Sequence, residues 1–277
     1  MEATVKSKKG RLTELLSDDE IAKLFALVGA SDSIELKATV PASAHQGTIA
    51  ALRIDPLNAQ IRQVFFFDTP DLTLNKAGIA VRARRVQGRG GDSVVKLRPV
   101  VPGELPEKFR VSPNMKVEVD AMPGGYVCSA SMKWKIGNDE VRRAARGKVP
   151  VRKVFSKEQR AFFDAHAPDG LDLDDLALLG PIFVLKEDIV PKDLGRKLSA
   201  ELWLLPDGTR IAELSTKCAP GEGMQVAVQT RSYLRGIGVD LDAETQTKTK
   251  SALEFFAGQL AAAPAPAAPA EASAQGS

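Results

Sequence analysis

Short segments in which charged and apolar residues alternate constrain this chain more than any other feature of its sequence. In Ser33–Val40 the even-numbered positions are apolar and the odd-numbered positions are polar, and Ile79–Val86 and Ser93–Pro99 alternate in a similar way. Because a strand directs successive side chains to opposite faces, each segment predicts a strand with one apolar and one charged face. The chain is therefore expected to fold around a sheet.

The remaining strands and the helices follow from the same patterns and from turn and capping residues. The other predicted strands are Gln60–Asp68, Lys116–Asp120, Val127–Ile136, Ile182–Val190, Leu198–Leu205 and Arg210–Lys217. Capping boxes at Ser17–Glu20 and Ser156–Gln159 predict the starts of two helices, and Gly88–Asp92 predicts a turn. The first of these helices is expected to have an apolar face formed by Ile21, Leu24, Phe25 and Val28. Thr69 is expected to cap a short helix whose first residue is Pro70. Helices are expected at about residues 17–29, 42–53, 69–78, 138–146, 156–165, 221–235 and 244–260.

The polar faces of the predicted strands carry a repeated set of charges. Arg82 and Arg84 share one face, and Lys96 and Arg98 share a face of the next strand. An open sheet with one solvated face explains any single strand, but it does not require Arg or Lys in nearly all of them. We therefore expect an α+β fold, a closed antiparallel β-barrel of about eight strands that forms a tunnel, with helices packed outside. Cations and carboxylates that line a tunnel suit a polyanion accompanied by a divalent cation.

Composition excludes several kinds of protein. The chain has 277 residues and a formal net charge of +3, no apolar run approaches the length of a membrane helix, and no apolar segment follows the basic residues of Met1–Arg11. A cytoplasmic protein without a membrane partner is expected.

Two cysteines and two histidines exclude a disulfide framework and a multi-histidine metal site, so metal ligands would be carboxylates, which favour Mg²⁺ or Mn²⁺. Aromatic residues form 5% of the chain, which argues against nucleic acid as a partner.

Low-complexity ends frame one predicted domain. Residues 1–11 and the Ala/Pro-rich residues 261–277 predict disordered tails. Between them we expect a single tunnel domain over residues 12–260, with a helical insertion at about 137–180 and C-terminal helices at about 221–260. The sequence does not indicate an oligomeric state.

Six motifs stand in order along the chain, at Ser33–Lys37, Asp68–Leu72 followed by Val81–Arg85, Ser93–Leu97, Lys116–Asp120, Leu179–Phe183 and Ile211–Ser215. Together they resemble the motifs of the CYTH family, also called triphosphate tunnel metalloenzymes, and the resemblance covers about residues 31–217. The family includes class IV type adenylate cyclases, thiamine triphosphatases and inorganic triphosphatases.

The resemblance implies a tunnel that binds a triphosphate-bearing small molecule together with one or two Mg²⁺ or Mn²⁺ ions. By position in the motifs, Glu35 and Lys37 would be catalytic. The side chains that would bind the substrate are Lys37, Arg82, Arg84, Lys96, Arg98, Lys133 and Lys186. Those that would bind metal are Glu35, Glu118, Asp120, Glu201 and Glu213.

Departures from the family's motifs leave more than one function open. Ser33 and Ser215 stand where the family has acidic residues, and Lys186 lies near a position that is often acidic, so the tunnel is more basic than the family pattern. The leading hypothesis is metal-dependent hydrolysis of a triphosphate, either inorganic or carried by a nucleoside or thiamine. The alternatives are a class IV type adenylate cyclase that makes cyclic AMP and pyrophosphate, and a polyphosphate- or nucleotide-binding module with little or no catalysis.

A few further side chains are interpreted by parity or position. Cys128 and Trp134 have apolar parity in their strand and are expected in the core, whereas Trp203 has polar parity. Thr247–Lys250 is expected to be a solvated helix face. The sequence does not decide between tunnel lining and ordinary solvated positions for Glu201, Lys133, Lys186, Arg160 and Lys217.

Overall fold

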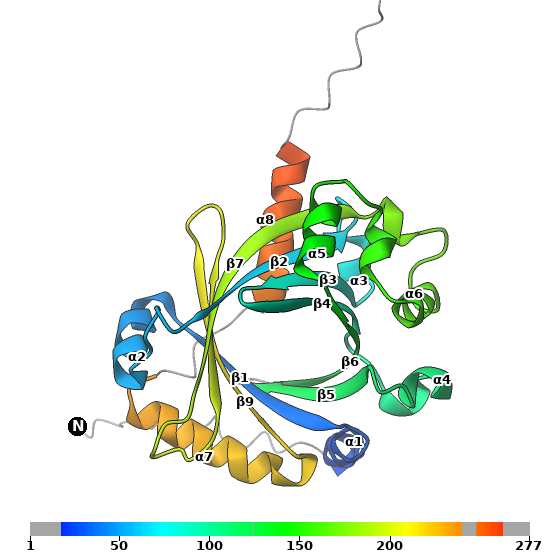
Figure 1. Ribbon diagram of the computed structural model, residues 1–277. Coiled ribbons are helices and arrows are strands. Elements are labelled where there is room, and N and C mark those ends of the chain that lie inside the picture. The colour runs from blue at the N-terminus through cyan, green and yellow to red at the C-terminus, as the bar shows by residue number, and fades with distance from the viewer. Residues whose placement is uncertain (1–17, 124, 240–247, 263–277) are drawn as a thin grey trace, which may run out of the picture.

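The computed structural model describes residues 18–123, 125–239 and 248–262. Its nine strands close into a barrel in the order β1-β5-β6-β4-β3-β2-β7-β8-β9, and β9 pairs back with β1 (Figure 1). The closed barrel with helices outside, expected from the sequence, is confirmed. The strands are β1 Ser33–Val40, β2 Gln60–Asp68, β3 Ile79–Val86, β4 Arg89–Leu97, β5 Met115–Met122, β6 Gly125–Ile136, β7 Ala177–Ile189, β8 Leu198–Leu204 and β9 Arg210–Cys218.

One strand pair departs from the antiparallel arrangement that the sequence suggested. β1 and β5 run parallel, with Ser33 beside Glu118 and Glu35 beside Asp120, whereas the other pairs of neighbouring strands in the described barrel are antiparallel. Only a hairpin connection forces two strands to be antiparallel, and β1 is joined to β5 through β2, β3 and β4. The parallel register sets acidic side chains of the two strands next to one another.

The helices lie outside the barrel (Figure 1). They are α1 Asp18–Gly29, α2 His45–Leu52, α3 Thr73–Lys76, α4 Glu107–Arg110, α5 Asn138–Ala145, α6 Lys157–Asp164, α7 Gly223–Gly236 and α8 Lys248–Ala262. The segment between β6 and β7 holds α5, α6 and the short turn η3 Val151–Val154, and it corresponds to the predicted insertion. The predicted capping box opens α6, because Ser156 and Gln159 exchange hydrogen bonds between their side chains and main-chain N–H groups.

The core lies between the outer face of the barrel and these helices. Gln159 of α6 is fully buried, accepts a hydrogen bond from Ser93 Oγ at 2.9 Å, and donates to the main-chain oxygens of Ser93 and Met132 at 3.0 Å each. This amide fixes the insertion across β4 and β6 while satisfying its own polar atoms. Cys128 is buried, as its parity predicted. Other outward-facing strand residues pack against apolar residues of the insertion in one cluster that contains Val81, Ala83, Val95, Ala130, Phe155, Phe162 and Phe163.

Three local predictions are wrong. Phe25, expected on the apolar face of α1, is 71% exposed. Helix α3 begins at Thr73 rather than at Pro70, because the Thr69 hydroxyl accepts its hydrogen bond from the Thr73 N–H at 2.8 Å. Trp134 is 45% exposed rather than part of the core, because a groove instead of a covering helix lies beside the end of β6.

Some predictions lie outside the described residues. These are the N-terminal tail, Ser17 of the first predicted capping box, residues 244–247 of the last predicted helix, and the tail from residue 263 onward. Residues 261 and 262, assigned to that tail by composition, belong to α8. No helix in the described part of the chain is long and apolar enough to cross a membrane.

Gly91 permits the close approach of β3 and β4 where their register shifts between Arg84 and Val86. A Cβ atom on Gly91 would lie 2.1 Å from the main-chain oxygen of Arg84. We expect Gly91→Ala to lower the free energy of unfolding by about 2 kcal/mol, measured by chemical denaturation, because the strands must move apart. Gly90→Ala is the matched control, since its Cβ would meet its nearest neighbouring atom, the Ile136 oxygen, at 3.4 Å. Equal stability of the two variants would contradict this account of the bulge.

Candidate functional site

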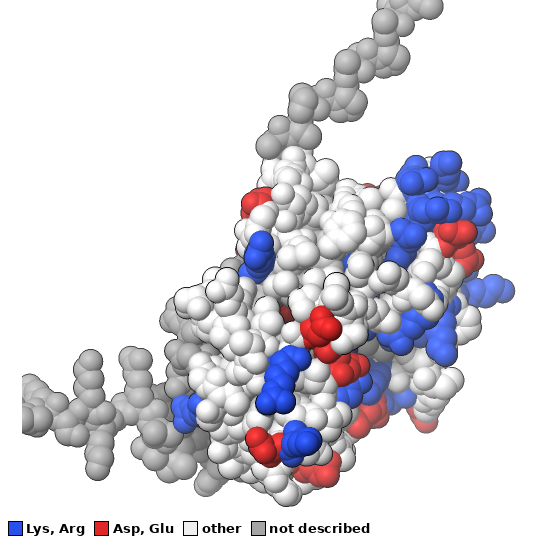
Figure 2. Space-filling view, turned by 60° about the vertical axis from the view of Figure 1, so that its left-hand side comes forward, with Lys and Arg blue, Asp and Glu red and all other residues white. Residues whose placement is uncertain are grey.

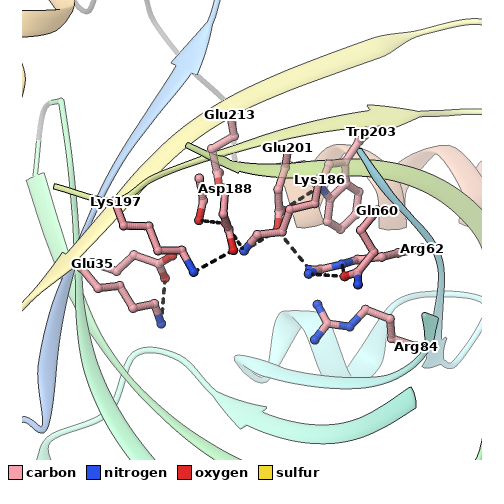
Figure 3. Close-up of polar contacts among 12 residues, drawn as sticks. Glu35, Gln60, Arg62, Arg84, Lys186, Asp188, Lys197, Glu201, Trp203 and Glu213 are labelled. Carbon is pink, nitrogen blue, oxygen red and sulfur yellow. Dashed lines mark hydrogen bonds and ion pairs between the residues drawn. The ribbon is translucent and has the colours of Figure 1, made fainter. Parts of the chain in front are cut away.

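The inward faces of the strands enclose a cavity of about 670 Å³, the tunnel. Among the described residues, fourteen Lys and Arg side chains but only five Asp and Glu side chains line it. Polar side chains from several strands point toward its centre (Figure 3). Asp120 lies behind this lining and is fully buried. All the other predicted site residues line the tunnel, namely Glu35, Lys37, Arg82, Arg84, Lys96, Arg98, Glu118, Lys133, Lys186, Glu201 and Glu213.

Asp120 is the centre of the first charge cluster. Its carboxylate lies 2.7 Å from Lys37 Nζ, 3.2 Å from Lys96 Nζ and 3.9 Å from Arg98 Nε. Burial raises the pKa of Asp120, but the charges of Lys96 and Lys37 outweigh burial and hold this pKa below its usual range. Burial lowers the pKa of Lys37, but Asp120, Glu35 and Glu213 together raise it above its ordinary value. Asp120 therefore holds Lys37 of β1, Lys96 of β4 and Arg98, which directly follows β4, in place around one buried carboxylate.

The parallel β1 and β5 pair forms the adjoining part of this cluster. Glu35 lies 3.1 Å from Lys37 Nζ and 3.6 Å from Lys217 Nζ, and Glu118 lies 2.5 Å from Lys217 Nζ. Ser33 donates a hydrogen bond of 2.9 Å from its hydroxyl to Glu118. The pKa of Glu118 is lowered because Lys217 and the Ser33 hydroxyl, with Lys116, outweigh the effect of burial. Ser33 thus acts as a donor to Glu118 at a position where the resemblance led us to look for a carboxylate.

A second cluster is centred on Asp92, which the sequence analysis assigned to a turn. Asp92 Oδ2 accepts hydrogen bonds from Arg84 at 2.5 and 3.0 Å, and the carboxylate also lies 3.9 Å from Arg82 and 3.8 Å from Lys133. Burial raises the pKa of Asp92, but Arg82 and Arg84 lower it further than burial raises it. β4 begins at Arg89, so the strand parity of Lys96, if extended backwards, would have identified Asp92 as an inward residue.

A third cluster joins β7, β8 and β9 to the start of α8. Lys248 Nζ lies 2.5 Å from Glu201 and 2.7 Å from Glu213, and it stands 5.0 Å from the ring centroid of Trp203. Burial lowers the pKa of Lys248, but Glu201 and Glu213 raise it above its ordinary value. Trp203 also donates from Nε1 to Glu201 at 3.2 Å. The prediction that Lys248 belongs to a solvated helix face is wrong, because α8 places its first residue against the tunnel.

Sequence reasoning missed other lining residues and left some undecided. Arg62 of β2 lies 3.6 Å from Glu201, and burial together with Arg84 lowers the pKa of Arg62 to about 10, so the guanidinium remains protonated at neutral pH. Arg62 has the same parity in the predicted strand as Val64 and Phe66, which also line the tunnel, so strand parity could have indicated that its side chain points inward. Lys217 lines the tunnel, whereas Arg160 donates to the main-chain oxygen of Phe155 at 2.6 Å outside it.

The predicted carboxylate ligands do not fit a divalent metal in this arrangement. Nowhere in the described residues do three Asp, Glu, His or Cys side chains gather in a geometry that could hold an ion. Each predicted ligand is within 4 Å of at least one lysine ammonium, and Lys248 occupies the space between two of them. The metal-ligand set expected from the family resemblance is therefore not assembled, and binding of Mg²⁺ or Mn²⁺ stays a prediction.

Comparison with known proteins supports the fold. No protein-family model and no curated protein sequence matches the chain. The structure of a candidate adenylate cyclase from Bacillus halodurans matches at 14% identity and a TM-score of 0.56, over 80% of this chain and 97% of its own. A candidate adenylyl cyclase from Hippeastrum, with a dominant triphosphatase activity, matches at 17% identity and a TM-score of 0.59, over 80% of this chain and 96% of its own. At these identities the similarity establishes the tunnel fold that the resemblance to the CYTH family implied.

Replacing Asp120 tests the first cluster. Asp120→Asn leaves three cations near a neutral amide, so we expect a loss of about 3 kcal/mol in the free energy of unfolding at pH 7. Because the folded-state pKa of Asp120 is lowered, its contribution is complete above the carboxyl's ordinary value of 3.8 and is lost as the pH falls below it. Denaturation curves should therefore show the difference between wild type and variant shrinking in acid. A difference that is independent of pH would rule out this electrostatic origin.

Replacing Lys248 tests whether its ammonium excludes a metal ion. Lys248→Ala removes the ammonium that lies between Glu201 and Glu213, although Arg62 and Lys186 remain within 4 Å of Glu201, so we expect Mn²⁺ to bind roughly tenfold more tightly than to wild type. Electron paramagnetic resonance of free Mn²⁺ measures this without any turnover. Lys250→Ala is the control, because Lys250 pairs instead with Glu254 at 3.8 Å. Unchanged Mn²⁺ affinity in Lys248→Ala would show that the ammonium does not compete with metal.

Proposed function

We propose that the tunnel binds the triphosphate group of a small molecule and hydrolyses its terminal phosphoanhydride. The observation that carries the proposal is the excess of Lys and Arg over Asp and Glu, fourteen to five among the described residues that line one enclosed cavity. A triphosphate carries several negative charges on a narrow chain, and cations inside low-dielectric walls bind such a chain more strongly than exposed cations do.

The binding side chains are held in place before any ligand arrives. Arg82 and Arg84 can bind phosphate oxygens through forked donors, and Lys96 and Lys186 supply point charges. Asp92 holds Arg82 and Arg84, Asp120 holds Lys96, and Asp188 lies 3.3 Å from Lys186, so little side-chain freedom is lost on binding. Burial lowers the pKa of Lys96 and of Lys186, and a phosphate chain beside them would favour their charged forms.

Hydrolysis needs a water molecule that attacks in line with the leaving oxygen. Glu35 lines the tunnel and lies 3.1 Å from Lys37, so its carboxylate can accept a hydrogen bond from that water while Lys37 faces the phosphate. The water oxygen bonds to the terminal phosphorus, the P–O bond to the diphosphate breaks, and the proton passes through Glu35 to solvent. Lys and Arg stabilise the charge that develops on the equatorial and leaving oxygens.

Two other functions share this tunnel and are separated by their products. A class IV type adenylate cyclase would release pyrophosphate and cyclic AMP, and the Bacillus halodurans structure is named as that of a candidate adenylate cyclase. A binding module would release nothing, and the engagement of Glu201 and Glu213 by Lys248 favours it over a metal-dependent enzyme. The dominant triphosphatase activity of the Hippeastrum protein supports hydrolysis ahead of cyclisation.

Purified protein is incubated with tripolyphosphate, ATP or thiamine triphosphate, with and without Mg²⁺ or Mn²⁺, and orthophosphate, pyrophosphate and cyclic AMP are quantified. We expect orthophosphate release that falls about 10²-fold in kcat for Glu35→Gln, with little change in KM. Arg82→Ala is expected to weaken binding by a factor of about 10 to 10², because a charged hydrogen bond to phosphate is lost.

Lys108→Ala is the control for these variants, because Lys108 lies on α4, outside the tunnel. Release of cyclic AMP and pyrophosphate from ATP would show that the protein is a cyclase and not a hydrolase. Binding that Arg82→Ala weakens, without any product, would leave only the binding module. Orthophosphate release that neither variant alters would place the activity outside the tunnel and refute the proposal.

A further inference from the structure

A second cavity of about 1100 Å³ lies where the barrel rim meets the insertion, and we call it the rim groove. It is lined by the ends of β4 and β6 and by the segment from η3 to the start of α6, including Trp134, Lys135, Lys153 and Lys157. Arg84, Arg89 and Lys133 line both the rim groove and the tunnel. The two cavities are therefore adjacent across one stretch of the rim.

Trp134 gives the rim groove an aromatic surface. Its side chain is 45% exposed, although the sequence pattern placed it in the core. Lys133 and Lys135 flank it on β6, and both are exposed. A partly exposed indole in a cavity lined by lysines can stack on a planar base, while lysines of the rim groove contact the phosphates of the strand.

The positive charge of the rim groove is only partly neutralised by its own carboxylates, because Asp92 pairs with Arg84 and Lys133 but not with the other lysines of the groove. Lys135, Lys153 and Lys157 are exposed, and none of them forms an ion pair with a described residue. Glu140 accepts a hydrogen bond from the Gly137 N–H at 2.8 Å, and Glu158 accepts one from Asn114 at 2.9 Å. These carboxylates serve local structure, and the lysines remain available to an anion.

The surroundings of the rim groove extend this charge. Exposed Arg and Lys side chains continue along the insertion at Arg142, Arg143, Arg146, Lys148 and Arg152, of which Arg142 pairs with Asp139 at 2.8 Å and Arg152 pairs with Asp174 at 2.7 Å. In the space-filling view, Lys and Arg side chains gather in one region of the surface rather than spreading evenly over it (Figure 2). A long anion that lies in the rim groove therefore meets further cations beyond it.

We propose that the rim groove binds single-stranded nucleic acid, with Trp134 stacking on a base and Lys135, Lys153 and Lys157 contacting phosphates. An inorganic polyphosphate would use the lysines, but it has no planar group to stack on the indole, so the exposed tryptophan favours a nucleic acid. This inference departs from the sequence-based expectation of no nucleic-acid partner, which rested on the low aromatic content of the chain. Because Arg84, Arg89 and Lys133 are shared, a bound strand has one end directed at the tunnel, a point that rests on the proposed function.

The test is fluorescence anisotropy with a labelled single-stranded RNA oligonucleotide that has a 5′-hydroxyl. We expect Trp134→Ala to weaken binding about tenfold and Trp134→Phe to retain most of the affinity, because the phenyl ring still stacks. Phe25→Ala is the matched control, since Phe25 is an exposed aromatic residue on α1, away from both cavities. In Lys135→Ala/Lys157→Ala, the slope of log affinity against log salt should decrease by about 0.7 for each lysine removed.

Tripolyphosphate binding, measured by calorimetry on the same variants, separates this proposal from the proposed function. We expect Trp134→Ala to leave tripolyphosphate affinity unchanged and Arg82→Ala to lower it, while a protein that fails to bind tripolyphosphate can still bind the oligonucleotide. If Trp134→Ala binds RNA as wild type does while the lysine variant is weakened, the rim groove recognises charge alone and the nucleic-acid assignment is wrong. If only Arg82→Ala weakens RNA binding, the strand lies in the tunnel and the rim groove is not its site.

Discussion

The neutralisation of inward-facing charge is the interaction on which the rest of this structure depends. A closed barrel whose inner faces carry mostly Lys and Arg would repel itself unless carboxylates from other strands stood among the cations. Asp120 on β5, Asp92 on β4 and Glu201 on β8 do this, each with cations from more than one element around it. The pKa of each of these carboxyls lies below its usual range, which shows that the surrounding cations outweigh the cost of burial.

The same three clusters fix the geometry of the tunnel. A carboxylate that holds a lysine or an arginine from behind leaves the cation's remaining donors directed at the lumen, so a bound anion need not order flexible side chains. The cations still exceed the carboxylates along the lining, so the net field inside the barrel is positive. Stability and anion binding therefore arise from one arrangement, in which the carboxylates make the fold possible and the surplus cations attract the ligand.

Two features distinguish this tunnel from the pattern of the family it resembles. Ser33 donates to Glu118, and Ser215 pairs with Lys37 across β1 and β9, so two positions contribute no negative charge. Lys248 adds a positive charge between Glu201 and Glu213. Affinity for a hard dication depends on the number of carboxylates that face it. The two serines reduce the number of carboxylates in the tunnel, and Lys248 neutralises two of those that remain.

The sequence by itself determined the strands, their inward faces and the helical insertion, because alternation and capping are local properties that depend on neighbouring residues only. It therefore identified Glu35, Arg82, Lys96 and Glu213 as lining residues correctly. Tertiary structure decided what no local pattern contains: the parallel pairing of β1 with β5, the entry of Lys248 from α8 into the tunnel, and the exposure of Trp134 beside the rim groove. Each of these three features depends on which distant segment packs against a strand. Strand parity predicts the direction in which a side chain points, but it does not predict which segment covers that side chain.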